Sequence, residues 1–156
     1  MYRRPEKLVL PELVSLGTFE TSEVRLGGVR ADGQDGLEIG YLEHGSVEWL
    51  TEGGLEEAGP NSLMIDRPGE WQGGKTAIVH PCRRYWLRFR FPPNGALPGV
   101  SAARAAELAT VYASMARRYF PASPGMLTLF AQLVAEQRAP REFGEELSRS
   151  LFHQIL

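Results

Sequence analysis

The sequence lacks features on which several large classes of protein depend. Its one cysteine, Cys82, cannot form a disulfide within the chain, so nothing indicates an oxidising compartment. No apolar run reaches the roughly 18 residues of a membrane-spanning helix, and the basic start at 1–5 is not followed by the apolar stretch of a signal peptide. The formal net charge of −2 argues against nucleic-acid binding by this chain unaided, because phosphate binding needs a dense basic surface. We therefore expect a cytoplasmic protein without a membrane segment.

The sequence does contain enough apolar material for one folded domain. Hydrophobic residues make up 43% of its 156 residues, and charged residues make up 23%. Residues 1–12 differ from the rest, because two prolines and several charges surround a short apolar run at 8–10. Such a segment has little to pack against within itself. We predict an N-terminal arm over residues 1–12 that docks on the body or on a partner, or stays mobile.

Residues 37–93 consist of short alternating runs separated by glycine and proline. Apolar residues alternate with others from Leu37 to Leu42, and a turn at 44–46 leads into a second alternating run, which is typical of a β-hairpin. Turns recur about every 6 to 12 residues, a spacing that suits a sandwich or barrel of antiparallel strands. The predicted strands cover 13–19, 23–29, 37–42, 47–51, 55–58, 63–65, 77–79 and 85–91. We predict an antiparallel β-barrel over residues 13–93.

After residue 95 the apolar spacing changes to that of helices. A first helix is predicted over 101–120 with Ser101 as its N-cap, a second ends near Arg138, and a third begins near Phe143. Their apolar stripes are Leu127, Phe130, Leu133 and Val134 in the second, and Phe143, Leu147, Leu151, Phe152 and Ile155 in the third. The fold class is therefore mainly β with α, a barrel followed by about three C-terminal helices within 101–156. The chain stops at Leu156 inside the last stripe, so we expect it to be cut within a helix.

The order of these motifs resembles the N-terminal effector-binding domain of AraC-type transcriptional regulators. The resemblance is carried by Gly45, by the phrase Gly59-Pro-Asn-Ser-Leu-Met-Ile-Asp-Arg-Pro-Gly-Glu-Trp71, and by the strand Tyr85-Trp-Leu-Arg-Phe-Arg-Phe91. It covers residues 8–156, with the specific part at 37–93. In that family the domain is a cupin-like barrel with trailing helices; the barrel binds a small-molecule effector and the helices pair two subunits. The resemblance implies an effector-sensing domain in a homodimer formed through the C-terminal helices.

The same family joins this domain to C-terminal helix-turn-helix units that bind DNA. After residue 100 the present chain has neither the length nor the basic charge for such units. The resemblance therefore implies that DNA binding resides in a C-terminal domain absent from this chain, which would be truncated before it.

Within the barrel, the resemblance points to five ligand-binding residues. Trp86 and Arg88 match effector-contacting positions on the family's pocket-lining strand, and Arg30 matches a ligand-contacting arginine. Trp71 and Gln72 follow the Pro-Gly turn at the barrel mouth, where Gln72 could supply a hydrogen bond. The alternatives are packing for Trp71 and a solvent-facing side chain for each arginine. An arginine inside a barrel must be paired, so the implied ligand is small and polar, either sugar-like or anionic.

The alternative function is that of a small cupin enzyme, an isomerase or a dioxygenase. A catalytic cupin holds a metal through two or three histidines and a carboxylate on neighbouring strands. This chain has three histidines in all, and where metal cupins carry a ligand histidine it has Gln72. Cys82 has no nearby base except His80, and no Ser, His and Asp grouping has a recognisable spacing. We therefore expect no catalytic residue, no metal and no cofactor.

Overall fold

The computed structural model describes residues 2–3, 8–26, 35–51, 54–69, 78–91 and 97–156. Its elements, in chain order, are β1 (Tyr2–Arg3), β2 (Leu13–Thr21), β3 (Arg25–Leu26), β4 (Leu37–His44), β5 (Val47–Thr51), β6 (Gly54–Ala58), β7 (Ser62–Asp66), β8 (Ile78–Val79), β9 (Cys82–Phe89), α1 (Ala102–Ser114), β10 (Tyr119–Pro121), α2 (Met126–Arg138) and α3 (Gly144–Ile155). The strands form two sheets in which every described pairing is antiparallel. The predicted β-rich fold with helices at the C-terminal end is confirmed.

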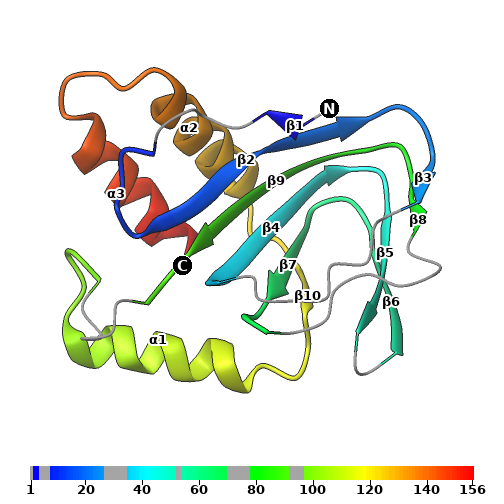
Figure 1. Cartoon of the computed structure of the whole chain (residues 1–156), viewed down its shortest axis with the longest axis horizontal. Coiled ribbons are helices and arrows are strands. Elements are labelled where there is room, and N and C mark those ends of the chain that lie inside the picture. Colours follow the sequence, from blue (N-terminus) through cyan, green and yellow to red (C-terminus); the bar gives the residue numbers. More distant parts are fainter. Residues whose placement is uncertain (1, 4–7, 27–34, 52–53, 70–77, 92–96) are drawn as a thin grey trace.

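The larger sheet has the order β1-β2-β9-β4-β7-β10 and the smaller one the order β3-β8-β5-β6. Short connections carry the chain from one sheet to the other between β2 and β3, between β4 and β5, and between β8 and β9. The hairpin predicted for the alternating runs of β4 and β5 is therefore wrong: both strands form, but β4 pairs with β7 and β9, whereas β5 pairs with β6 and β8. Figure 1 shows the long strands of the larger sheet running towards the smaller sheet at one end. Helices α2 and α3 cover one face of the larger sheet (Figure 1). Helix α1 lies near the end of the long strands that is away from the smaller sheet (Figure 1).

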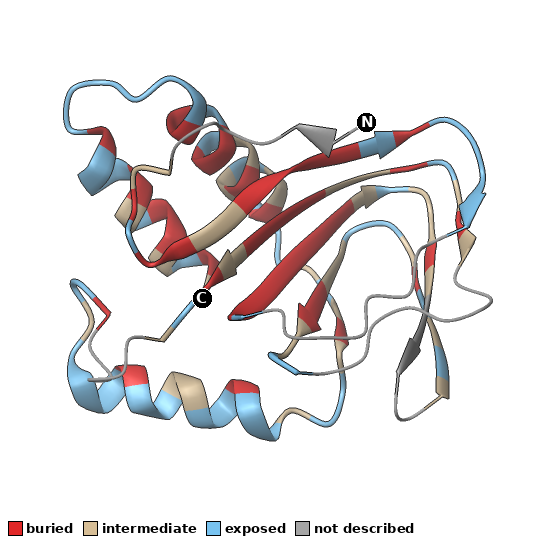
Figure 2. Cartoon of the chain, viewed as in Figure 1, coloured by how far each residue is buried: buried red, intermediate tan, exposed pale blue. Residues whose placement is uncertain are grey.

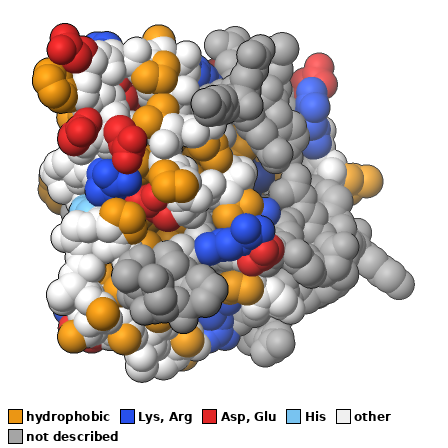
Figure 3. All heavy atoms as spheres, turned by 60° about the vertical axis from the view of Figure 1, so that its left-hand side comes forward, with side chains coloured by type: hydrophobic (Ala, Val, Ile, Leu, Met, Phe, Trp, Pro, Cys, Tyr) orange, Lys and Arg blue, Asp and Glu red, His pale blue; other side chains and the backbone are white. Residues whose placement is uncertain are grey.

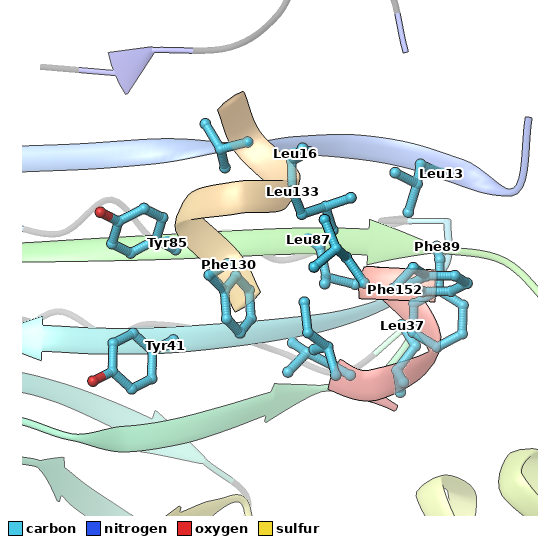
Figure 4. Packing of buried hydrophobic residues seen from close by; sticks show 14 of the residues in the cluster. Leu13, Leu16, Leu37, Tyr41, Tyr85, Leu87, Phe89, Phe130, Leu133 and Phe152 are labelled. Atoms are coloured by element: carbon cyan, nitrogen blue, oxygen red, sulfur yellow. The ribbon is translucent and has the colours of Figure 1, made fainter. Parts of the chain in front are cut away.

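One hydrophobic core lies between the larger sheet and helices α2 and α3, and we call it the helix-side core. Its most buried members include Leu16, Ile39, Tyr41, Tyr85, Leu87, Phe89, Phe130, Leu133, Leu151, Phe152 and Ile155. Aromatic rings join the layers: Phe130 of α2 stacks on Tyr41 at 5.9 Å between centroids, and Phe152 of α3 meets Phe89 edge-on at 5.1 Å. Figures 2 and 4 show this buried layer and the rings that close it. The apolar faces of α2 and α3 are buried here, as their stripes predict.

A second, smaller core lies between the two sheets, and we call it the inter-sheet core. The larger sheet contributes Phe19, Leu42, Met64, Cys82, Trp86 and Tyr119, and the smaller sheet contributes Val47, Ala58 and Val79. Strand alternation produces both cores from the same strands, because successive side chains of a strand point to opposite faces. On β9, Tyr85 and Leu87 enter the helix-side core, while Trp86 enters the inter-sheet core.

The described part of the predicted arm is attached to the body. Tyr2 and Arg3 pair with β2, and Leu10 is fully buried in the helix-side core. The backbone N–H of Val9 donates to Oε1 of Gln137 in α2 at 2.7 Å. The amide of Gln137 in turn donates to Oγ of Ser148 in α3 at 2.8 Å. These contacts fix residues 8–10 against α2 and, through Gln137, link them to α3.

The predicted first helix is too long, and the structure corrects its end. Ser101 caps it as predicted, by accepting a hydrogen bond from the N–H of Arg104, but α1 stops at Ser114. Tyr119 and Phe120, predicted as the end of this helix, instead form β10 together with Pro121 and pair with β7. The open edge of β7 supplies backbone partners that a local apolar spacing cannot reveal, so a distant strand decides the conformation here.

Other boundaries shift by smaller amounts. The strand predicted over 23–29 is described only to residue 26, where β3 covers Arg25–Leu26. The third helical stripe is buried only in part: Leu151, Phe152 and Ile155 are buried, while Phe143 is 73% exposed and Leu147 39% exposed. Figure 3 shows the side that carries α1 and α3, where hydrophobic side chains lie among basic and acidic ones. In the described chain, every helix is too short or too polar to cross a bilayer.

Candidate ligand-binding site

The candidate site is the inter-sheet face of β9. This strand lies between β2 and β4, so its side chains have neighbours on both sides. Alternation places Arg84, Trp86 and Arg88 on one face, opposite the aromatic and aliphatic side chains of the helix-side core. Three polar or amphipathic side chains in a row on the central strand of a buried face need partners.

Trp86 fills the middle of this face. Its side chain is in the inter-sheet core and only 5% exposed. In the strand register, Trp86 stands opposite Gly17 of β2 on one side and Gly40 of β4 on the other. A glycine on each flanking strand leaves the space that a large indole requires, and a Cβ built on Gly40 would already meet Cε of Met64 at 2.9 Å. The indole is therefore packed between the two sheets.

Arg88 is paired within the chain. Its guanidinium forms an ion pair with the carboxylate of Glu38, its direct cross-strand neighbour on β4. The two side chains are 13% and 11% exposed. Among the described residues, no group accepts a hydrogen bond from the buried Nε of Arg88. An ion pair with one unbonded guanidinium N–H thus lies on the same face as Trp86.

Arg84 and Glu38 are site residues that the sequence reasoning missed. The Arg84 guanidinium lies 5.5 Å from the centroid of the Phe19 ring, a cation–π contact on the same face as Trp86. The predicted strand began at residue 85, whereas β9 begins at Cys82, so alternation from the true start would have included Arg84. Glu38 belongs to an alternating strand too, but only the register between β4 and β9 identifies it as the partner of Arg88.

The other predicted site residues are placed as follows. Arg30, Trp71 and Gln72 lie outside the described residues. Arg90, which alternates with Trp86 and Arg88 in the sequence, lies beyond the end of β9. It forms an ion pair with Asp35 at the surface, where the two side chains are 56% and 63% exposed. The structure thus brings Trp86 and Arg88 to one buried face and leaves Arg90 outside it.

The titratable groups of the inter-sheet core are held in their neutral forms. Burial raises the pKa of the Cys82 thiol above its ordinary value, which reduces the thiolate fraction that a nucleophile needs. Burial, reinforced by the charge of Asp66, also raises the pKa of the Tyr119 phenol. His80 lies at the surface end of this region with Nε2 3.9 Å from Oε1 of Glu48. Within the described ranges, three or more His, Cys, Asp or Glu side chains nowhere gather in a metal-binding group.

Comparison with solved structures adds a fold-level relationship. A variant of ToxT from Vibrio cholerae aligns with 97% of this chain and 55% of its own, at 6% identity and a TM-score of 0.57. The AraC-like transcriptional activator CuxR aligns with 92% of this chain and 49% of its own, at 13% identity and a TM-score of 0.56. ToxT with a bound unsaturated fatty acid aligns with 99% of this chain and 55% of its own, at 8% identity and a TM-score of 0.51.

The chain therefore spans about half the length of these proteins and shares their fold. No protein-family model matches the chain, and no curated protein is similar to it in sequence. The predicted resemblance in fold, a cupin-like sheet pair with trailing helices as in AraC-like regulators, is confirmed.

Proposed function

We propose that this chain is the effector-sensing and dimerisation part of an AraC-type transcriptional regulator, acting in the cytoplasm. It would comprise an arm at 1–12, a ligand-binding barrel at 13–93 and a helical segment at 101–156. The observation that carries the proposal is the fold shared with CuxR, an AraC-like transcriptional activator, over 92% of this chain. Because the chain spans 49% of CuxR, DNA binding is assigned to a C-terminal helix-turn-helix domain outside it.

The proposed effector is a small polar molecule bound against the inter-sheet face of β9. Trp86 would stack on its apolar side, and Arg88 with Glu38 would offer a donor and an acceptor to its hydroxyl groups. A sugar-like ligand fits this pair better than a bare anion, because Glu38 already neutralises much of the charge of Arg88. Arg30, Gln72 and Trp71 remain proposed contacts on the strength of the family resemblance.

The structure of ToxT with a bound unsaturated fatty acid supports a sensing role for this fold in general. That ligand belongs to ToxT. It carries a carboxylate, whereas the effector proposed here carries hydroxyl groups. An effector acts by binding one arrangement of the regulator more tightly than another, so binding must be measurable on the isolated chain before any effect on DNA is sought.

The test is binding of pentoses, hexoses and hexuronic acids, measured by thermal shift and then by calorimetry. The informative variant replaces the pair with neutral amides, Glu38→Gln with Arg88→Gln, which removes both charges, keeps the size of the Glu38 side chain and shortens that of Arg88. We expect this double variant to lose tenfold or more in affinity, about 1.4 kcal/mol or more. The matched control neutralises the exposed α1 pair, Arg104→Gln with Glu107→Gln, whose side chains are 59% and 60% exposed, and should bind as wild type does. Equal affinity in both double variants would contradict the site.

The proposed homodimer uses the exposed end of α3. Phe143 and Leu147 are four residues apart on this helix and remain 73% and 39% exposed, although both belong to its apolar stripe. A large aromatic side chain at the surface is a common anchor of a protein interface. We expect Phe143→Glu with Leu147→Glu to shift the chain from dimer to monomer in light scattering, while the same change at exposed Val24 and Leu55 leaves the mass unchanged.

The rival function is a small cupin enzyme. It predicts one tightly bound metal ion per chain in elemental analysis of the purified protein, together with turnover of a substrate. The sensing proposal predicts reversible ligand binding without turnover. A stoichiometric metal with product formation would replace the sensing proposal by the enzymatic one.

A further inference from the structure

A cavity of about 870 Å³ lies between α1 and the ends of the long strands. Its wall is formed by residues 11–12, the start of β4, the segments after β7 and β9, and one face of α1. The described residues that line it are all separate from the inter-sheet core, so this cavity is distinct from the site around Trp86. It is large enough for a small organic molecule.

The face of α1 that borders the cavity carries small side chains. Ala109 and Ala113 line the cavity, and the buried residues of this helix are Ala105 and Tyr112. Protein interiors are normally close-packed, and larger side chains at the two lining alanines would fill this space. The sequence of α1 therefore keeps the cavity open on the helix side.

Two hydrogen bonds hold the C-terminal end of α1 in place over the cavity. The hydroxyl of Tyr112 donates to the backbone carbonyl of Leu156 at 2.9 Å, and the guanidinium of Arg67 donates to the carbonyl of Ala113. Moving the helix onto the strand ends would break or distort both bonds, so the helix cannot close the space without a cost. A molecule that fits between the helix and the strands gains contacts that the helix itself does not make.

Most of the described wall is apolar. Pro11, Pro68 and Phe91 line the cavity and keep part of their surface accessible. Leu37 of β4 and Tyr112 of α1 form its more deeply buried part, and the rings of Phe91 and Tyr112 lie 6.5 Å apart between centroids. These side chains offer an apolar surface on both the strand side and the helix side of the cavity.

The charged groups of the described wall already have partners. Arg90 forms an ion pair with Asp35, and Arg67 donates to a backbone carbonyl of α1. Glu12 pairs with Arg149 of α3 at 3.4 Å. A charged ligand would lose its hydration here without meeting a free counter-charge among these residues, whereas an uncharged apolar ligand carries no such cost. The pairing of the charges therefore favours a neutral occupant.

We propose that this cavity is a second ligand site, for an uncharged and mainly apolar small molecule. The molecule lies against Phe91 and the prolines Pro11 and Pro68, with Ala109 of α1 on its other side. Because it contacts the helix and the strand ends at once, its binding holds α1 more firmly to the larger sheet. This site does not depend on the sensing function proposed for the inter-sheet face.

The test compares three small molecules on the intact chain by titration in NMR. The probe is n-butylbenzene; 4-butylbenzoate adds a negative charge to the same body, and 4-butylbenzylamine adds a positive one. We expect each charged molecule to bind at least about tenfold more weakly than n-butylbenzene, because its charge must be desolvated. Equal or tighter binding of either charged molecule would overturn the proposal, and so would a lack of n-butylbenzene binding up to its solubility limit.

A pair of variants on α1 locates the site. Ala109 lines the cavity, so Ala109→Phe should abolish n-butylbenzene binding by filling the space. Ala103 is exposed on the same helix and is not among the residues that line the cavity, so it provides the control. Ala103→Phe should bind n-butylbenzene as the unmodified chain does. Retained binding in Ala109→Phe would contradict the proposed location.

If Ala109→Phe fails to fold, the unmodified protein decides the question. Chemical-shift changes at Phe91 and Tyr112, with slower deuterium exchange of the α1 amides on binding, support the proposal. Shift changes centred on the Trp86 indole overturn it. Absence of sugar binding together with binding of n-butylbenzene would contradict the inter-sheet site alone, so the two proposals fail separately.

Discussion

The two faces of the larger sheet differ in chemistry although they are built from the same strands. On β9, Tyr85, Leu87 and Phe89 face a layer of aromatic and aliphatic side chains closed by α2 and α3. Trp86 and Arg88 face the smaller sheet, where an ion pair to Glu38 interrupts the apolar core. The first face is built for stability, since it contains little that a polar ligand could replace. The second face contains the Arg88–Glu38 ion pair, which offers polar groups to a ligand. The helix-side face therefore stabilises the fold, whereas the inter-sheet face is the one proposed to bind the effector.

The largest expected effect comes from breaking the helix-side core. Phe130 is fully buried and packs against both Tyr41 and Tyr85. Phe130→Ala should lower the free energy of unfolding by about 3 to 5 kcal/mol, through lost burial and the cavity left behind. Urea denaturation measures this, with Val24→Ala as the control at a 62% exposed position outside the proposed dimer contact, where less than about 0.5 kcal/mol is expected. A small effect at Phe130 would mean that α2 does not depend on this contact.

An intermediate effect is expected from breaking the ion pair of the inter-sheet face. Arg88→Ala leaves the nearly buried Glu38 carboxylate without its partner and should lower the free energy of unfolding by about 2 to 3 kcal/mol. The loss is smaller than for a fully buried ion pair, because both side chains retain some exposure. Glu38→Gln with Arg88→Gln should recover most of this loss. The double-mutant cycle measures the coupling, and additive losses would show that the two side chains do not act as a pair.

The smallest expected effect is on the pH dependence of stability, through a carboxylate of α2. Glu136 of α2 accepts hydrogen bonds from the backbone N–H, Nε and Nη2 of Arg141, and these bonds lower the pKa of Glu136 below its ordinary value of 4.5. A lowered carboxyl pKa contributes stability above pH 4.5 that is lost as the pH falls through the folded-state pKa. Arg141→Ala should therefore make the free energy of unfolding depend less on pH in the acid range. Denaturation experiments at several values between pH 3 and pH 6 measure this dependence. An unchanged dependence would exclude this contact as its source.

Local patterns in the sequence predict much of this fold. Period-two alternation from Leu37 to Thr51 predicts the strands β4 and β5, although not that they lie in different sheets, and alternation also assigns Trp86 and Tyr85 to opposite faces. Ser101 as an N-cap is also a local signal, because the bond it makes is to Arg104, three residues along. These features depend on neighbours in the chain.

Other features depend on distant partners and could not be predicted from the sequence. Residues 119–121 follow a helix at helical spacing and form a strand only because β7 offers its edge. Glu38 and Arg88 are 50 positions apart and become partners through sheet register.

The hydrogen-bonded link from Val9 through Gln137 to Ser148 has a consequence for exchange with solvent. Gln137 is 2% exposed and Ser148 is fully buried, so the amide of Val9 is held by a side chain that water does not reach. We therefore expect residues near Val9 to open together with the α2–α3 pair. In deuterium exchange, the Val9 amide should be protected as long as the amides at the centre of α2, and Gln137→Ala should release it while the strands of the larger sheet stay protected.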